Sequence, residues 1–105
     1  MEEECNKIKK VLISNINLLN GTEALVKTTG DELSKWRNEN IELEYRYLNN
    51  QIEKNDYIVK QLGIEEKIRV AKNENEFSKG MLSATMKEIE KLVNELKGCE
   101  LKKLL

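Results

Sequence analysis

Apolar side chains recur along the first half of the chain at alternating steps of four and three residues. The series is Met1, Cys5, Ile8, Leu12, Asn15, Leu19, Thr22, Val26, Thr29, Leu33, Trp36, Asn40, Leu43 and Tyr47, in which Asn15, Thr22, Thr29 and Asn40 are polar. Such steps place residues on one face of an α-helix and are typical of a coiled-coil seam. Near residue 40 a shifted series begins and passes through Ile41, Tyr45, Leu48, Ile52, Asn55, Val59 and Leu62. The pattern predicts a helix that continues to Leu62.

A turn is expected immediately afterwards, at Gly63. The order Leu62-Gly63-Ile64 is typical of a helix that ends in a left-handed glycine, with the next apolar residue packed against the last turn. A second apolar series then runs through Ile64, Ile68, Ala71, Asn75, Ser78, Leu82, Met86, Ile89, Val93 and Leu96, with an extra four-residue step near Gly80. This series predicts a return helix from Ile64 to near Gly98.

Gly21 and Gly30 leave two interpretations of the first helix open. The sequence Thr29-Gly30-Asp31-Glu32 has the form of a capping box, which would begin a new helix. The unbroken phase of the seam instead favours a continuous helix that tolerates each glycine at a cost of about 1 kcal/mol. We predict an all-α fold in a single domain, residues 1–105. It is a long helical hairpin turning near Gly63 with a shorter N-terminal helix, as a three-helix bundle or coiled coil.

Composition supports helices and excludes several classes of function. The 105 residues include no proline, five glycines and 5% aromatic residues, which favours long helices over a sheet. The 18 basic and 19 acidic side chains give a formal net charge of −1, so we expect no nucleic-acid partner. Apolar runs such as Val11-Leu12-Ile13 are far too short for a membrane span.

The N-terminus and the two cysteines predict a reducing compartment. The chain opens Met1-Glu2-Glu3-Glu4, which is acidic where a secretion signal is basic, so we expect a cytoplasmic or nuclear protein. A hairpin turning at Gly63 would place Cys99 opposite position 27. Cys5 and Cys99 would then be too far apart for an intrachain disulfide, and both are expected to be free thiols.

Residues suited to catalysis or ligand binding are few. The chain has no histidine to act as a base, and two isolated cysteines do not form a zinc site. No glycine-rich phosphate-binding motif occurs, and acidic pairs such as Glu65-Glu66 have neither a histidine nor an apolar depression beside them that would suit them to catalysis or to a metal. We therefore predict no enzyme activity, no cofactor, no metal and no small-molecule substrate.

The seam supplies the candidate partner-binding residues. Asn15 and Asn40 would set helix register and the choice of partner, although a loose bundle with half-exposed polar positions is an alternative. Trp36 is expected either in the core or as an exposed anchor for a partner. The predicted partner-binding set is Leu12, Asn15, Leu19, Val26, Leu33, Trp36, Asn40 and Leu43.

These residues predict a non-catalytic interaction protein, a small subunit or adaptor of an intracellular multiprotein assembly. It would act through coiled-coil or helix-bundle contacts, as a homo-oligomer or a hetero-oligomer. The alternative is a small helical protein that acts by occupying a target's surface, such as a secretion chaperone or adaptor, or a viral or phage inhibitor of a host protein.

Two families have sequences of similar character. Residues 15–36, from Asn15-Ile16-Asn17 through Val26, Gly30 and Leu33 to Trp36, resemble the helical core of small subunits of the fungal DASH outer-kinetochore ring. The glycine-to-tryptophan spacing is shorter here. The chain is also similar in length and helicity to the small helical-hairpin substrates and adaptors of type VII secretion, but it lacks their Trp-x-Gly turn. Neither resemblance assigns a functional residue.

Overall fold

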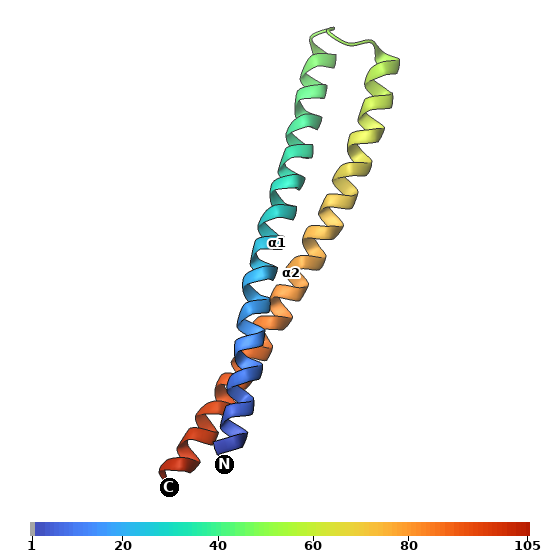
Figure 1. Ribbon diagram of the computed structural model, residues 1–105. Helices are drawn as coiled ribbons and strands as arrows, with labels where there is room; N and C mark the ends of the chain where they lie inside the picture. Colours follow the sequence, from blue (N-terminus) through green and yellow to red (C-terminus); the bar gives the residue numbers. More distant parts are fainter. Residues whose placement is uncertain (1) are drawn as a thin grey trace. The chain divides into compact units, whose positions relative to one another are not determined.

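The computed structural model describes residues 2–105, so the predicted place of Met1 on the seam lies outside the described residues. Two helices account for almost all of this range: α1 (Glu2–Leu48) and α2 (Lys54–Leu104). Figure 1 shows them joined at one end by a short loop. The described residues contain no strand, and the predicted all-α helical hairpin is confirmed.

The position predicted for the turn is wrong, because the chain reverses between Leu48 and Lys54 and not at Gly63. Asn50 has a left-handed backbone with φ of 56°, a conformation that asparagine adopts more readily than most residues. The amide of Asn50 donates to the carbonyl of Tyr47 at 3.1 Å, and that of Gln51 donates to Arg46 at 2.9 Å. These two bonds form a Schellman motif, with asparagine in the place that glycine usually takes.

Gly63 instead lies inside α2, and its φ is not positive. A Cβ added there would meet no atom within 4 Å, so no close approach of another segment requires a glycine. The shifted series that supported a helix through Leu62 is largely exposed, with Ile41, Leu48 and Val59 between 68% and 72% accessible.

The N-terminal segment is one helix and not a short helix followed by a break. Gly21 and Gly30 both lie within α1, so the hairpin has two helices where three were predicted. The seam keeps its phase through both glycines, and its packing outweighs their low helix propensity.

The chain divides into two compact units. The tip unit, residues 25–78, contains the loop and the adjoining parts of both helices. The end unit combines residues up to 24 with residues 79–105. The described residues of each unit form an antiparallel pair of helix segments, and in the end unit the first turns of α1 lie beside the last turns of α2 (Figure 1). The expectation of a single domain stays a prediction.

Burial follows heptad spacing in both helices. Every position of the predicted α1 series from Cys5 to Tyr47 is buried or half-buried, which confirms the seam. In α2 the predicted series is correct as far as Leu82, but Thr85 and Leu92 are buried where Met86 and Val93 were expected. The α2 series therefore continues without an extra step near Gly80. Its members are Tyr57, Gln61, Ile64, Ile68, Ala71, Asn75, Ser78, Leu82, Thr85, Ile89, Leu92, Leu96 and Cys99.

Candidate interaction surfaces

Three interhelical pairs define the register of the two helices, and each of the three has Ile52 at its midpoint. Cys5 and Cys99 are 94 positions apart and form a disulfide. Thr29 and Asn75 are 46 positions apart and share a hydrogen bond. The rings of Tyr47 and Tyr57 stack with their centroids 4.1 Å apart. Since each pair is centred on Ile52, a turn at this point brings the two heptad series face to face.

The eight predicted partner-binding residues all lie on this seam. Leu33 and Leu43 are buried, whereas Leu12, Asn15, Leu19, Val26, Trp36 and Asn40 are half-buried. The seam of α1 packs against α2 of the same chain, so the partner that the structure gives these residues is intramolecular. Their binding of another chain stays a prediction.

Polar residues within the seam differ in what they contact. Asn75 is 5% exposed, and its amide nitrogen donates to the Val26 carbonyl at 3.1 Å and to Thr29 Oγ1 at 3.0 Å. Asn15 donates to the Val11 carbonyl of its own helix, and Asn40 Oδ1 is buried without a hydrogen-bond partner. Asn75 is therefore suited to fix the register, a role that we expected of Asn15 and Asn40. All three asparagines lie on the seam, and the sequence contains no signal that tells which of them bonds to the other helix.

Trp36 combines the two roles considered for it, because it is half-buried on the seam and also contacts surface charges. Lys67 Nζ of α2 lies 4.0 Å from the centre of a Trp36 ring, and Lys35 Nζ lies 4.8 Å from it. The indole nitrogen donates to Glu32 Oε1 at 3.3 Å. An ammonium group over an indole at an exposed site contributes about 0.5 to 1 kcal/mol. Trp36 thus helps to hold the two helices of the tip unit together.

Next to the loop, a hydrogen bond joins the helices on one flank of the seam. Tyr57 is 9% exposed, and its hydroxyl donates to Glu44 Oε2 at 2.8 Å. This bond holds the proton on the phenol, and together with burial and the negative charge of Glu44 it raises the pKa of Tyr57 above its ordinary value. The stacked ring of Tyr47 covers the same side chain.

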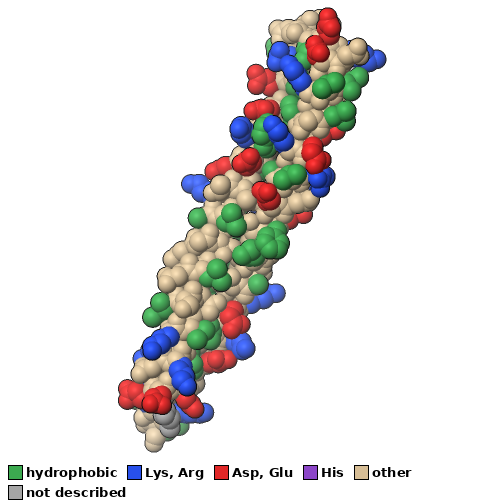
Figure 2. All heavy atoms as spheres, turned by 45° about the vertical axis from the view of Figure 1, so that its right-hand side comes forward, with side chains coloured by type: hydrophobic (Ala, Val, Ile, Leu, Met, Phe, Trp, Pro, Cys, Tyr) green, Lys and Arg blue, Asp and Glu red, His purple; other side chains and the backbone are tan. Residues whose placement is uncertain are grey.

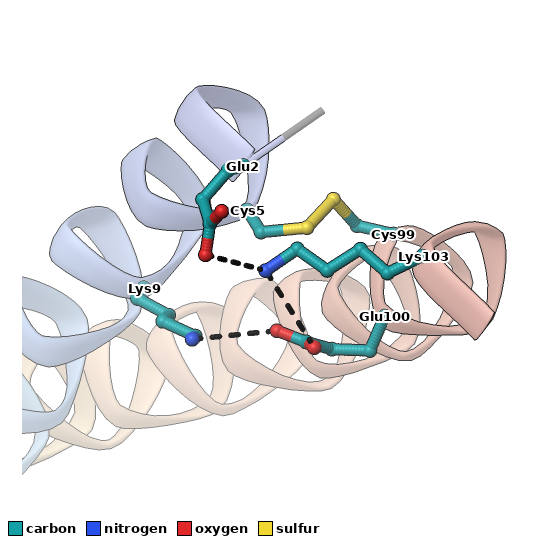
Figure 3. The surroundings of a disulfide bond; sticks show 6 residues. All are labelled: Glu2, Cys5, Lys9, Cys99, Glu100 and Lys103. Carbon is teal, nitrogen blue, oxygen red and sulfur yellow. Dashed lines mark ion pairs between the residues drawn. A yellow bond between two sulfur atoms is a disulfide. The ribbon is translucent and has the colours of Figure 1, made fainter.

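The end unit is closed by the disulfide, which contradicts the prediction of two free thiols. Cys5 is fully buried and Cys99 is 8% exposed. Figure 3 shows the bond between the two helices, with ion pairs beside it: Lys9 to Glu100 at 3.3 Å, and Lys103 to Glu2 at 3.5 Å. The prediction failed because it followed from the turn at Gly63. A turn centred on Ile52 places Cys99 opposite Cys5.

Apolar side chains also occupy the outer surface. On the face drawn in Figure 2, hydrophobic side chains reach the surface among charges of both signs. In the tip unit, one group comprises Ile41, Tyr45 and Leu48 of α1 with Ile58, Val59 and Leu62 of α2, each between 41% and 72% exposed. We name these six residues the tip patch. Most of these residues belong to the shifted apolar series of the sequence. That series therefore lies on an outward face of the helices and does not continue the seam.

The described residues provide no grouping of three or more acidic, cysteine or histidine side chains suited to a metal ion. Within residues 2–105, no helical stretch combines the length and the apolar character needed to cross a membrane. No protein family model, curated protein or solved structure matches this chain. The resemblance of residues 15–36 to small DASH subunits therefore gains no support from a family match.

Proposed function

We propose that this chain is a non-catalytic interaction protein, a small subunit or adaptor that packs its helices against another protein chain. The observation that supports this best is the exposure of apolar residues. Among the described residues, more large hydrophobic side chains are exposed than are buried, although α1 and α2 already cover each other's seam. Apolar surface on this scale is typical of proteins that bury it in further contacts.

The proposal includes the cellular compartment in which the protein acts. Disulfides persist in oxidising compartments and are rare in the cytosol and nucleus. The buried bond between Cys5 and Cys99 therefore favours an oxidising compartment over the cytoplasmic or nuclear location that the acidic N-terminus suggested.

A second candidate function is binding by occupancy, in which the hairpin covers a site on a target protein. The supporting observation is that the seam is covered within the chain and closed by a disulfide, as suits a protein that folds before it meets its target. Thermal unfolding of the purified chain separates the two candidates. An occupancy protein melts in one cooperative transition alone, whereas an obligate subunit gains most of its helix content when its partner is added.

Chemical cross-linking of the full chain in the cells that produce it, followed by reconstitution from purified components, tests the interaction function. We expect a complex of fixed stoichiometry by light scattering, either with another chain or with further copies of this one. The proposal is wrong if the purified chain stays monomeric and no cross-linked chain re-forms a complex with it.

A further inference from the structure

The two units differ in what holds their helix segments together. In the tip unit, the Asn75 amide donates to the Val26 carbonyl and to Thr29, and the Tyr57 hydroxyl donates to Glu44. These bonds cross between the helices, so separation of the helices would leave polar groups without their partners. The loop between α1 and α2 belongs to the same unit. The tip unit therefore has several independent links.

In the end unit, buried hydroxyl groups bond within their own helix. The Thr22 hydroxyl donates to the Leu18 carbonyl at 2.7 Å, and the Thr85 hydroxyl donates to the Met81 carbonyl at 2.8 Å. Thr22 and Thr85 are 3% and 7% exposed, so both occupy the seam. Because each hydroxyl keeps its bond when the helix segments separate, opening the end unit breaks neither of these hydrogen bonds.

Apolar burial in the end unit is also small. Among the described residues of this unit, Leu92 is the only buried hydrophobic side chain besides the two cysteines. The tip unit buries Leu33, Leu43, Tyr57 and Ala71. Since apolar burial is the main favourable term in packing, packing holds the end unit together less firmly than the tip unit.

Ion pairs beside the disulfide add little to the link between the helices (Figure 3). Lys9 pairs with Glu100 at 3.3 Å, and Lys103 pairs with Glu2 at 3.5 Å. Their side chains are between 26% and 82% exposed, and ion pairs in contact with solvent are weak. The disulfide is therefore the principal link between the two helix segments of the end unit.

We propose that the disulfide is a redox-controlled clasp, whose reduction opens the end unit and leaves the helices of the tip unit paired. The open form exposes seam residues of α1 that the closed form partly covers, namely Ile8, Leu12 and Leu19. This inference goes beyond the proposed function, because it concerns when the seam is accessible and not which chain binds it.

Reduction proceeds by thiol–disulfide exchange with an external dithiol. Cys99 is 8% exposed and Cys5 is fully buried, so the attacking thiolate reaches the Cys99 sulfur. A bond forms between the reductant and Cys99, the bond to Cys5 breaks, and Cys5 leaves as a thiolate that takes up the proton lost by the reductant. The second thiol of the reductant then displaces Cys99 in the same way. The two cysteines end as thiols and the reductant ends as a disulfide.

Hydrogen–deuterium exchange of the full chain, with and without dithiothreitol, tests the clasp. We expect reduction to raise amide exchange about tenfold in the end-unit parts of both helices, because a helix segment that has lost its partner is only marginally stable in water. Exchange between Thr29 and Ser78 in the tip unit should change less than about twofold. Reoxidation should restore the original protection.

A cysteine variant shows whether the reductant acts through this bond. The double variant Cys5→Ser and Cys99→Ser should exchange like the reduced chain in both buffers. Its exchange in the end unit should therefore not respond to dithiothreitol.

Substitutions in the seam test whether weak packing lets the reduced end unit open. Thr22→Val with Thr85→Val should slow exchange of the reduced end unit about threefold, because the added apolar groups are buried only in the closed form. The matched control is Ser14→Val with Ser83→Val, which changes two exposed residues of the same unit and should leave exchange unaltered.

Unchanged exchange on reduction overturns the clasp. An equal rise in both units also overturns it, because the disulfide would then stabilise the whole hairpin and control no part of it separately. Protection that does not return on reoxidation overturns the reversibility that a switch requires. The proposed interaction function is tested separately, by association with another chain, and none of these results decides it.

Discussion

Asn40 and Asn75 occupy equivalent seam positions but differ in their hydrogen bonds, and we expect them to have opposite effects on stability. Asn40 Oδ1 is buried with no hydrogen-bond partner, whereas the Asn75 amide bonds across to α1. Asn40→Leu should therefore raise the free energy of unfolding by about 1 to 2 kcal/mol, since it removes an unsatisfied acceptor. Asn75→Ala should lower it by a similar amount. Denaturant titration of both variants measures this, and a loss of stability in Asn40→Leu would contradict the assignment.

Because of Tyr57, we expect the free energy of unfolding to fall at alkaline pH. Its pKa is raised in the folded state, chiefly by the hydrogen bond to Glu44. The stability from this bond is therefore fully present below the unfolded pKa of about 10, and it is lost as pH rises through the higher folded pKa. We expect Tyr57→Phe to be less stable than the unaltered chain at pH 8 and to lose less stability between pH 9 and pH 12. Equal losses in the two proteins would contradict this expectation.

At the scale of the helices, Gly63 and Asn50 test where the chain turns. Gly63→Ala should raise the free energy of unfolding by about 1 kcal/mol, because Gly63 lies in a helix with open space beside it. Asn50→Ala should lower it by about 1 kcal/mol, while Asn50→Gly should not, because only the alanine strains a left-handed backbone. Thermal unfolding compares the three variants. Destabilisation by Gly63→Ala would instead support a turn at that glycine.

The all-α helical hairpin and the α1 seam were predictable, because heptad spacing of Leu, Val and Ile is a strong local signal. The turn was not, because the shifted series of Ile41, Tyr45 and Leu48 imitates a continuing seam and Leu62-Gly63-Ile64 imitates a helix end. Asn49-Asn50 was the available signal, since asparagine can replace glycine in the left-handed position. The interhelical role of Asn75 depends on register, which a single sequence does not specify.

At the scale of the whole molecule, the position of the turn determines whether the two cysteines can form a disulfide. A turn predicted at Gly63 kept them apart. Moving the midpoint to Ile52 pairs Cys5 with Cys99 and closes a loop across 94 positions. Closure of a loop this long stabilises a fold by about 2 to 5 kcal/mol, mainly by restricting the unfolded chain. Reduction of the disulfide, or replacement of both cysteines by serine, should lower the free energy of unfolding by about this amount and therefore lower the denaturant concentration at the unfolding midpoint. An unchanged midpoint would contradict a closed hairpin.

The central claim is a single antiparallel hairpin with its midpoint at Ile52, and the cysteine linkage tests it most directly. The chain is equilibrated in a glutathione redox buffer, its remaining thiols are blocked, and its intact mass and proteolytic peptides are determined without reduction. We expect a species of one chain that lacks two hydrogens, and one linked peptide pair that joins Cys5 to Cys99. Two blocked thiols, or bonds only between separate chains, would contradict this register.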